Sequence, residues 1–130
     1  MVSANATPAR VYIVEDSASI RERLCEQLHE IDGVSVIGNS DTADSAIEAI
    51  LRTRPDSVIL DIHLIGGSGI DVLREVHDQA PEVMFIVLTN HSNAQYRRAC
   101  LQAGARYFFD KSTEFGKVRE VIAGLGATQH

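Results

Sequence analysis

The chain has 130 residues, of which 45% are hydrophobic and 23% charged, and its net charge at pH 7 is −6. This length and balance fit one globular domain with its own core and exclude two full domains. No apolar run reaches the roughly 18 residues that a membrane span needs, and the first residues lack the apolar segment of a secretion signal. We therefore expect one cytoplasmic domain over residues 1–130, without membrane contact, with a core over about 9–125 and short flexible ends.

The charge is distributed unevenly along the chain. Residues 1–91 hold 6 basic and 15 acidic side chains, whereas residues 92–130 hold 6 basic and 3 acidic side chains. The excess of acid argues against direct nucleic-acid binding, because most of the surface would repel phosphate groups. Cys25 and Cys100 lie within helical patterns and lack CxxC spacing, so we interpret both as packed free thiols.

Strand-like and helix-like segments alternate along the chain. Short apolar runs predict strands, and apolar residues at helical spacing predict a helix after each one. The predicted strands cover 11–14, 34–37, 58–60, 83–88 and 107–109, and the predicted helices cover 20–31, 43–51, 70–76, 96–103 and 115–125. Gly33 is expected to end the first helix, and Asp41 or Thr42 to cap the second.

Five successive strand–helix units predict an α/β fold, a doubly wound five-stranded parallel sheet with helices on both faces. The run 83–88 contains no polar residue, which is typical of a strand covered on both faces. We expect that strand at the centre of the sheet. In open sheets of this kind, ligands bind beyond the carboxyl ends of the strands.

The residues that follow the predicted strands carry reactive groups. Glu15 and Asp16 follow the first strand, Asp61 the third, Thr89 ends the fourth, and Lys111 comes shortly after the fifth. Carboxylates about 5 Å apart repel by roughly 3 kcal/mol per pair at an effective dielectric constant near 20, so three together need a cation. A few oxygen ligands suit Mg²⁺, with Mn²⁺ as a substitute. A carboxylate beside the ion can attack phosphorus, and Asp61 is our candidate nucleophile.

This ordered set of residues resembles a response-regulator receiver domain of bacterial two-component signalling, a CheY-like domain, over about residues 9–125. The resemblance rests on the acidic pair Glu15 and Asp16, Asp61 in VILDIHL, Gly69, Thr89 in IVLTN and Lys111 in GARYFFDK. It implies the flavodoxin-like receiver fold with strand order 2-1-3-4-5.

The resemblance also implies a function and a set of roles. Asp61 would accept a phosphoryl group from a sensor histidine kinase or a histidine phosphotransfer protein, as a signalling domain rather than an enzyme acting on other substrates. Thr89 and Lys111 would bind the phosphoryl oxygens. The implied Mg²⁺ ligands are Glu15, Asp16, Asp61 and the backbone carbonyl of His63.

In the family's switch, Thr89 moves toward the phosphoryl group and an aromatic residue, here Phe108, turns inward. This would reshape the surface of the fourth helix, fifth strand and fifth helix. The basic residues of that surface are Arg97, Arg98, Arg106, Lys117 and Arg119. An acidic downstream partner, an attached effector domain or a homodimer could use it, and a solvated face is the plain alternative.

Three positions depart from the receiver pattern. Ile65 stands where a proline is usual four residues after the aspartate, which predicts a looser loop. Ser112 follows Lys111 in place of proline, so a cis bond there is not expected. Asn90 replaces a very small residue beside Thr89 and would narrow access to the aspartate.

Two histidines lie where side chains overhang the phosphoryl group in the family. His63 comes two residues after Asp61, and His91 comes two residues after Thr89. With Asn90 they are expected to set the lifetime of the phosphorylated form. The two imidazoles also suit zinc or nickel, but no soft third ligand accompanies them.

Other interpretations compete with the receiver function. A phosphohydrolase of the haloacid-dehalogenase type also uses an aspartate nucleophile, but it needs a second acid where this chain has His63. A flavodoxin-like flavin carrier would cradle phosphate in the first loop, where Glu15 and Asp16 repel it.

Plain structural roles are open as well. The acidic pair could complement the first helix dipole, Thr89 could cap a helix, Phe108 could be ordinary core and Lys111 could be solvated.

Overall fold

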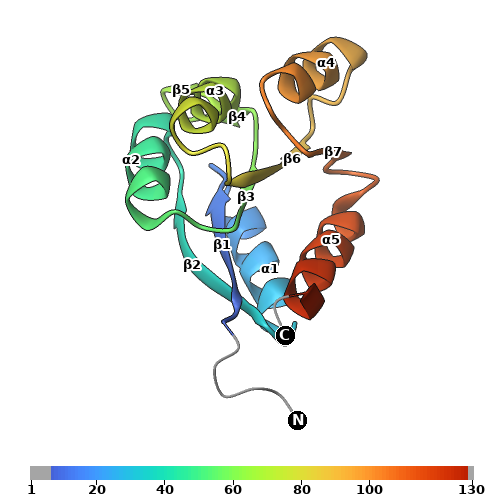
Figure 1. Cartoon of the computed structure of the whole chain (residues 1–130). Coiled ribbons are helices and arrows are strands. Elements are labelled where there is room, and N and C mark those ends of the chain that lie inside the picture. The colour runs from blue at the N-terminus through green and yellow to red at the C-terminus, as the bar shows by residue number, and fades with distance from the viewer. Residues whose placement is uncertain (1–6, 129–130) are drawn as a thin grey trace.

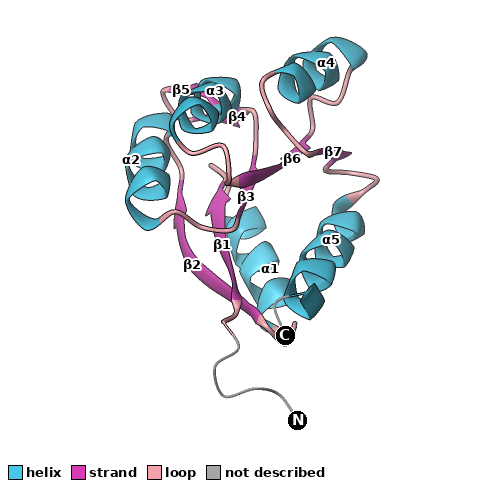
Figure 2. Ribbon diagram, viewed as in Figure 1, coloured by secondary structure: helices cyan, strands magenta, loops and turns pink. Residues whose placement is uncertain are grey.

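The computed structural model describes residues 7–128, in which five main strands alternate with five helices (Figures 1 and 2). The strands of the main sheet are β1 (Ala9–Val14), β2 (Val34–Ser40), β3 (Ser57–Leu60), β6 (Met84–Thr89) and β7 (Tyr107–Asp110). The helices are α1 (Ala18–His29), α2 (Ala43–Thr53), α3 (Gly69–Gln79), α4 (Ala94–Gln102) and α5 (Phe115–Thr128). The outermost parts of the ends expected to be flexible, 1–6 and 129–130, lie outside the described residues.

The main sheet is parallel throughout, in the order β2-β1-β3-β6-β7. Numbered along the chain, this is the predicted order 2-1-3-4-5, so the doubly wound fold is confirmed. The central strand is β3, and the expectation that the run 83–88 lies at the centre is wrong. β6 pairs with β3 and β7 and is buried on both faces from Phe85 onward, so its lack of polar residues reflects burial rather than central position.

Each face of the sheet has its own hydrophobic core. On one face, α2, α3 and α4 cover residues such as Val58 and Val87. On the other face, α1 and α5 cover Ile59 and Ile86 (Figure 1). The alternation of neighbouring residues between the two cores follows from the two-residue period of a strand. The sheet is therefore packed on both faces, and the carboxyl ends of its strands form one rim.

Local signals set the ends of the first two helices. α1 ends at His29, earlier than predicted, and Gly33, with φ of 81°, lies in the turn that leads to β2. Of the two candidate caps of α2, Thr42 takes the role, because its Oγ1 accepts a hydrogen bond from the N–H of Ser45 at 3.3 Å.

A small antiparallel hairpin follows β3 and was not predicted. It pairs β4 (His63–Leu64) with β5 (Gly67–Ser68), and its turn contains Gly66 with φ of 71°. Strands of two residues give no readable periodicity. The hairpin places His63 beside the rim.

Both cysteines are free thiols, as expected. Cys100 is buried, and this burial raises its pKa to about 11. Within residues 7–128, no helix has the length and apolar character needed to span a membrane.

Candidate functional site

The functional groups predicted at the strand ends meet at one rim of the sheet. Two backbone hydrogen bonds extend the strand pairing beyond the strands themselves. The N–H of Asp61 donates to the carbonyl of Val14 at 3.0 Å, and the N–H of Lys111 donates to the carbonyl of Thr89 at 2.9 Å. These bonds fix the points at which the two reactive side chains leave the sheet.

The centre of the rim is a buried ion-paired cluster. Lys111 Nζ lies 2.7 Å from Glu15 Oε1 and 2.9 Å from Asp61 Oδ2. The three side chains are 10%, 3% and 8% exposed, respectively, so the alternative of a solvated Lys111 is wrong. Asp16 is exposed beside them. We call Glu15, Asp16, Asp61 and Lys111 the charged cluster.

The three carboxylates of the charged cluster are close enough to share one ion. Each of Glu15, Asp16 and Asp61 offers an oxygen that lies within 4.8 Å of the other two. Asp61 Oδ1 is buried and has no hydrogen-bond partner among the described residues. An unpaired buried acceptor carries a desolvation cost that a bound cation removes. A set of carboxylate oxygens fits Mg²⁺ better than a soft metal.

Burial and charge act in opposite directions in this cluster. Burial raises the pKa of Glu15, although hydrogen bonds from Lys111 and from the N–H of Ser17 partly offset the effect. Burial alone would lower the pKa of Lys111, but its hydrogen bonds to Glu15 and Asp61 outweigh burial and the pKa is raised. One ammonium group therefore faces two carboxylates and remains charged at neutral pH.

Glu15 also fits the structural alternative in which the acidic pair complements the start of the first helix. Its Oε2 accepts a hydrogen bond from the N–H of Ser17 at 3.0 Å, at the start of α1. The carboxylate thus serves the helix end with one oxygen and Lys111 with the other.

Gly69 is required by a close approach to Asp61. A Cβ added to Gly69 would lie 2.0 Å from the backbone oxygen of Asp61. The N–H of Gly69 donates to the carbonyl of Ile62 at 2.6 Å. Glycine at this position therefore lets the loop after β3 close directly onto the chain that carries Asp61.

Thr89 and Phe108 lie on the neighbouring strands β6 and β7, where the register pairs Thr89 with Asp110 and Phe108 with Val87. Thr89 is fully buried, and its Oγ1 accepts a hydrogen bond from the N–H of His91 at 3.1 Å. Asn93, not Thr89, caps α4. Phe108 is 4% exposed and already faces the core. The guanidinium of Arg97 lies 5.7 Å from the centre of its ring and donates to its carbonyl at 3.2 Å.

The two histidines meet above the loops that follow β3 and β6. The rings of His63 and His91 stack with centroids 3.7 Å apart and planes 27° apart. Nitrogen lone pairs lie in the ring planes, so stacked rings do not aim them at one shared ion, which disfavours the zinc or nickel interpretation. The ring of Tyr96, from α4, is steeply inclined to both imidazoles, and its centroid lies 6.1 Å from the centroid of each.

We call His63, His91 and Tyr96 the aromatic cluster. Sequence reasoning placed both histidines at the rim but missed Tyr96. The available signal was its position in the first turn of the helix that follows His91.

Comparison with known proteins identifies the family. The model of the response regulator receiver domain matches residues 11–123. The chain belongs to this family. A putative transcriptional regulator of Pseudomonas aeruginosa is 31% identical over 120 residues, which cover 89% of this chain and 58% of that protein. The chain spans 56% and 58% of the length of two curated relatives that it matches.

Solved receiver domains share the fold. A CheY-like receiver domain protein from Methanospirillum hungatei superimposes with a TM-score of 0.83 at 23% identity, covering 95% of this chain and 97% of that one. CheY in a CheX–CheY–BeF3–Mg²⁺ complex from Borrelia burgdorferi gives 0.83 at 23% identity, covering 92% and 90%.

Ile65 and Ser112, which replace the usual prolines of the receiver pattern, each donate a backbone hydrogen bond in this receiver domain. The N–H of Ile65 donates to the carbonyl of Asp41 at 3.2 Å, and the N–H of Ser112 donates to Asp110 Oδ1 at 2.8 Å. Proline could donate neither bond. The loop expected to be looser is instead paired as a hairpin and tied to the strand before α2. No cis peptide bond occurs in residues 7–128.

Proposed function

We propose that Asp61 accepts a phosphoryl group in an Mg²⁺-dependent reaction with a phosphohistidine on a sensor histidine kinase or a histidine phosphotransfer protein. The observation that carries the proposal is the buried carboxylate of Asp61, with one oxygen paired to Lys111 and the other without a protein partner. A bond forms between an Asp61 oxygen and phosphorus while the bond between phosphorus and the donor imidazole nitrogen breaks.

The groups around Asp61 are proposed to bind the metal ion and the phosphoryl oxygens. Glu15, Asp16, Asp61 and the backbone carbonyl of His63 would hold Mg²⁺, for which Mn²⁺ could substitute. When bound, the ion neutralises charge on the transferring phosphoryl group. Lys111 already contacts the carboxylate that is to be modified, so it can pair with a phosphoryl oxygen after a short movement. The CheY complex of similar fold contains Mg²⁺ with BeF3, which supports this assignment.

Thr89 and Phe108 are proposed to couple phosphorylation of Asp61 to a change in the shape of the surface. The hydroxyl of Thr89 would donate a hydrogen bond to the phosphoryl group. Phe108 is already buried beneath Arg97, so the space that Thr89 vacates would shift the ring within the core rather than bring it in from solvent. Arg97 would move with the ring, because its guanidinium donates a hydrogen bond to the carbonyl of Phe108.

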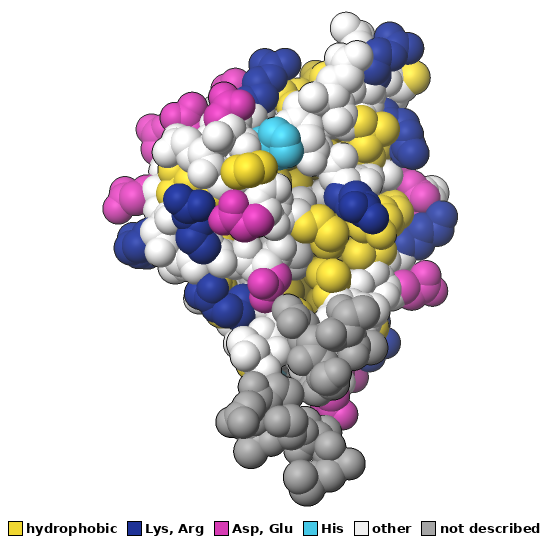
Figure 3. All heavy atoms as spheres, in the orientation of Figure 1, with side chains coloured by type: hydrophobic (Ala, Val, Ile, Leu, Met, Phe, Trp, Pro, Cys, Tyr) yellow, Lys and Arg dark blue, Asp and Glu magenta, His cyan; other side chains and the backbone are white. Residues whose placement is uncertain are grey.

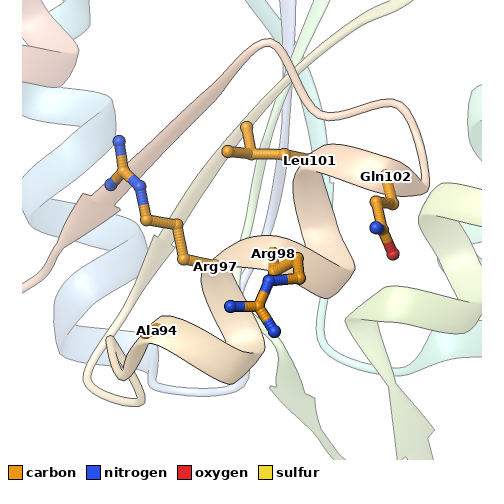
Figure 4. A pocket seen from close by; sticks show the side chains of 5 residues that line it. All are labelled: Ala94, Arg97, Arg98, Leu101 and Gln102. Carbon is orange, nitrogen blue, oxygen red and sulfur yellow. The ribbon is translucent and has the colours of Figure 1, made fainter.

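The surface of α4, β7 and α5 is the proposed output face. A hollow of about 490 Å³ runs along α4 and is lined by Ala94, Arg97, Arg98, Leu101 and Gln102 (Figure 4). Leu101 is 41% exposed there. Hydrophobic side chains also gather beside basic ones on the side of the molecule where β7 and α5 lie (Figure 3).

A partner is proposed for this face on grounds of charge. Arg97, Arg98, Arg106, Lys117 and Arg119 are all exposed. Basic side chains around apolar surface favour an acidic protein partner, an attached effector domain or a second copy of the domain. The net charge of −6 disfavours nucleic acid as a ligand of this domain.

His63, Asn90 and His91 are proposed to set how long the phosphoryl group persists. All three side chains are exposed, and they lie in the loops directly after Asp61 and Thr89. From these positions they would restrict the approach of a water molecule that attacks the phosphoryl group.

The test is phosphorylation by a small phosphodonor, such as acetyl phosphate, with and without Mg²⁺. The native chain should incorporate one phosphoryl group only with Mg²⁺, and Asp61→Asn should incorporate none. Asp71→Asn, which changes an exposed aspartate in the first turn of α3, is the matched control and should behave as the native chain. Sustained hydrolysis of small phosphomonoesters would instead favour a phosphohydrolase.

A further inference from the structure

The aromatic cluster connects three parts of the chain at the rim. His63 lies in β4 just after Asp61, His91 lies in the loop just after Thr89, and Tyr96 lies in the first turn of α4. β3 and β6, which lead to Asp61 and Thr89, are neighbours in the sheet. The stacked imidazoles therefore bridge the two loops that flank the proposed phosphoryl site.

We infer that Tyr96 is a positioning residue that holds these imidazoles together as a cover against water at the phosphoryl site. The inference rests on the proposed function of Asp61. Two exposed rings stacked on each other can slide or separate freely unless a third group fixes them. The ring of Tyr96 contacts both imidazoles at interplanar angles of 77° and 68°, which is the favoured edge-to-face arrangement of aromatic pairs.

Tyr96 is suited to this role because it contacts both the core and the rim. Its ring is half-buried and packs against the core beneath α4, whereas His63 and His91 are exposed. Core contacts fix the tyrosine, and the tyrosine fixes the imidazoles. A tyrosine that served the core alone would have no edge contact with two exposed rings.

The same contacts link the cover to α4. Cys100 is the one fully buried residue of α4, so few contacts resist a small displacement of this helix. A displacement would carry Tyr96 with it and loosen the imidazole stack. Binding of a partner along α4 would then alter the lifetime of the phosphoryl group, and phosphorylation would in turn alter the affinity for that partner.

The direction of the effect follows from the placement of the rings. An intact stack restricts the approach of water, so the loss of Tyr96 should shorten the lifetime of phosphorylated Asp61. A single aromatic edge contact shifts a two-state equilibrium by roughly twofold to tenfold. The expected shortening for Tyr96→Leu lies in that range, and Tyr96→Phe, which keeps the ring edge, should stay within about twofold of the native lifetime.

The experiment measures the decay of phosphorylated Asp61 after removal of the phosphodonor, together with the imidazole proton resonances of the unphosphorylated protein. Tyr107→Leu is the matched control, because Tyr107 is also half-buried but packs against the opposite core. We expect a shorter lifetime and weaker nuclear Overhauser contacts between the two imidazoles in Tyr96→Leu, and neither change in Tyr107→Leu or Tyr96→Phe.

A double-variant cycle separates action through the imidazoles from general loosening. His63→Ala should shorten the lifetime as Tyr96→Leu does, and the two changes combined should add little to either alone. Additive effects, or a native lifetime in Tyr96→Leu, would overturn the inference.

The same measurements distinguish failure of the proposed function from failure of the inference about Tyr96. If native protein is not phosphorylated at Asp61, the proposed function fails. The imidazole resonances then decide the inference: unchanged nuclear Overhauser contacts between His63 and His91 in Tyr96→Leu overturn it, and their loss supports the positioning role of Tyr96. If Tyr96→Leu does not fold, Tyr96→Met is compared with Tyr96→Phe by the same two measurements.

Discussion

The charged cluster and the aromatic cluster lie at the same rim but are held by different forces. Glu15, Asp61 and Lys111 are buried and joined by short ion pairs. His63 and His91 are exposed and joined to Tyr96 by ring contacts, each worth about 0.5–1.5 kcal/mol. We propose a matching division of roles, in which the charged cluster accepts the phosphoryl group and the aromatic cluster sets how long it persists.

The largest expected effect comes from removing the cation of the charged cluster. Lys111→Met leaves Glu15 and Asp61 buried without a counter-charge, so the free energy of unfolding at pH 7 without Mg²⁺ should fall by about 3 kcal/mol. Urea denaturation measures this. The control is Lys117→Met, which removes an exposed pair with Glu114 and should cost less than about 1 kcal/mol. Equal urea midpoints for the two variants would contradict a buried ion-paired cluster.

Magnesium should stabilise the protein through the same cluster. At about 100 times its dissociation constant, an ion that binds only the folded state adds about 2.7 kcal/mol. Asp16 is exposed and belongs to the candidate ligand set, so Asp16→Asn should lose this stabilisation while unfolding normally without metal. Thermal unfolding with and without Mg²⁺ tests it, and a full Mg²⁺ shift in Asp16→Asn would exclude this residue as a ligand.

The raised pKa of Lys111 predicts a dependence on alkaline pH. A folded-state pKa above the ordinary 10.5 means that the stabilisation is complete below pH 10.5 and is lost as the pH rises through the folded-state value. The stability difference between native protein and Lys111→Met should therefore be flat in the neutral range and shrink at strongly alkaline pH. Urea midpoints across this range measure the effect, and a difference that persists unchanged would show that Lys111 stabilises by packing alone.

The smallest effects are expected in the aromatic cluster. His63→Ala or His91→Ala should change the lifetime of the phosphorylated form by roughly twofold to tenfold and leave the Mg²⁺-induced thermal shift unchanged. The decay of the phosphoryl group and thermal unfolding are measured on the same samples. A lifetime equal to that of native protein in either variant would show that the substituted histidine does not control the lifetime of phosphorylated Asp61.

The two clusters also differ in how far the sequence predicts them. The charged cluster follows from topology, because parallel strands bring their carboxyl ends to one rim whatever the loops do. The sequence therefore predicts that Glu15, Asp61 and Lys111 lie together. The contact of Tyr96 with the imidazoles depends on ring orientation and on the placement of α4, which residue spacing does not determine.

The other differences between the sequence-based predictions and the structure also have local causes. The β4–β5 hairpin is too short to produce a periodic pattern, and the early end of α1 reflects a three-residue turn before Gly33 that apolar spacing cannot detect. The family pattern suggested that the loss of proline at Ile65 weakens a loop. The structure instead uses the N–H that proline lacks.

We propose above all that Asp61, within the charged cluster, accepts a phosphoryl group in an Mg²⁺-dependent reaction. Tandem mass spectrometry of the native chain, after incubation with acetyl phosphate and Mg²⁺, tests it most directly. We expect a single phosphoryl group, located on Asp61 and absent when Mg²⁺ is chelated. A chain that remains unmodified, or one that carries the phosphoryl group on His63, His91 or a hydroxyl side chain, would contradict it.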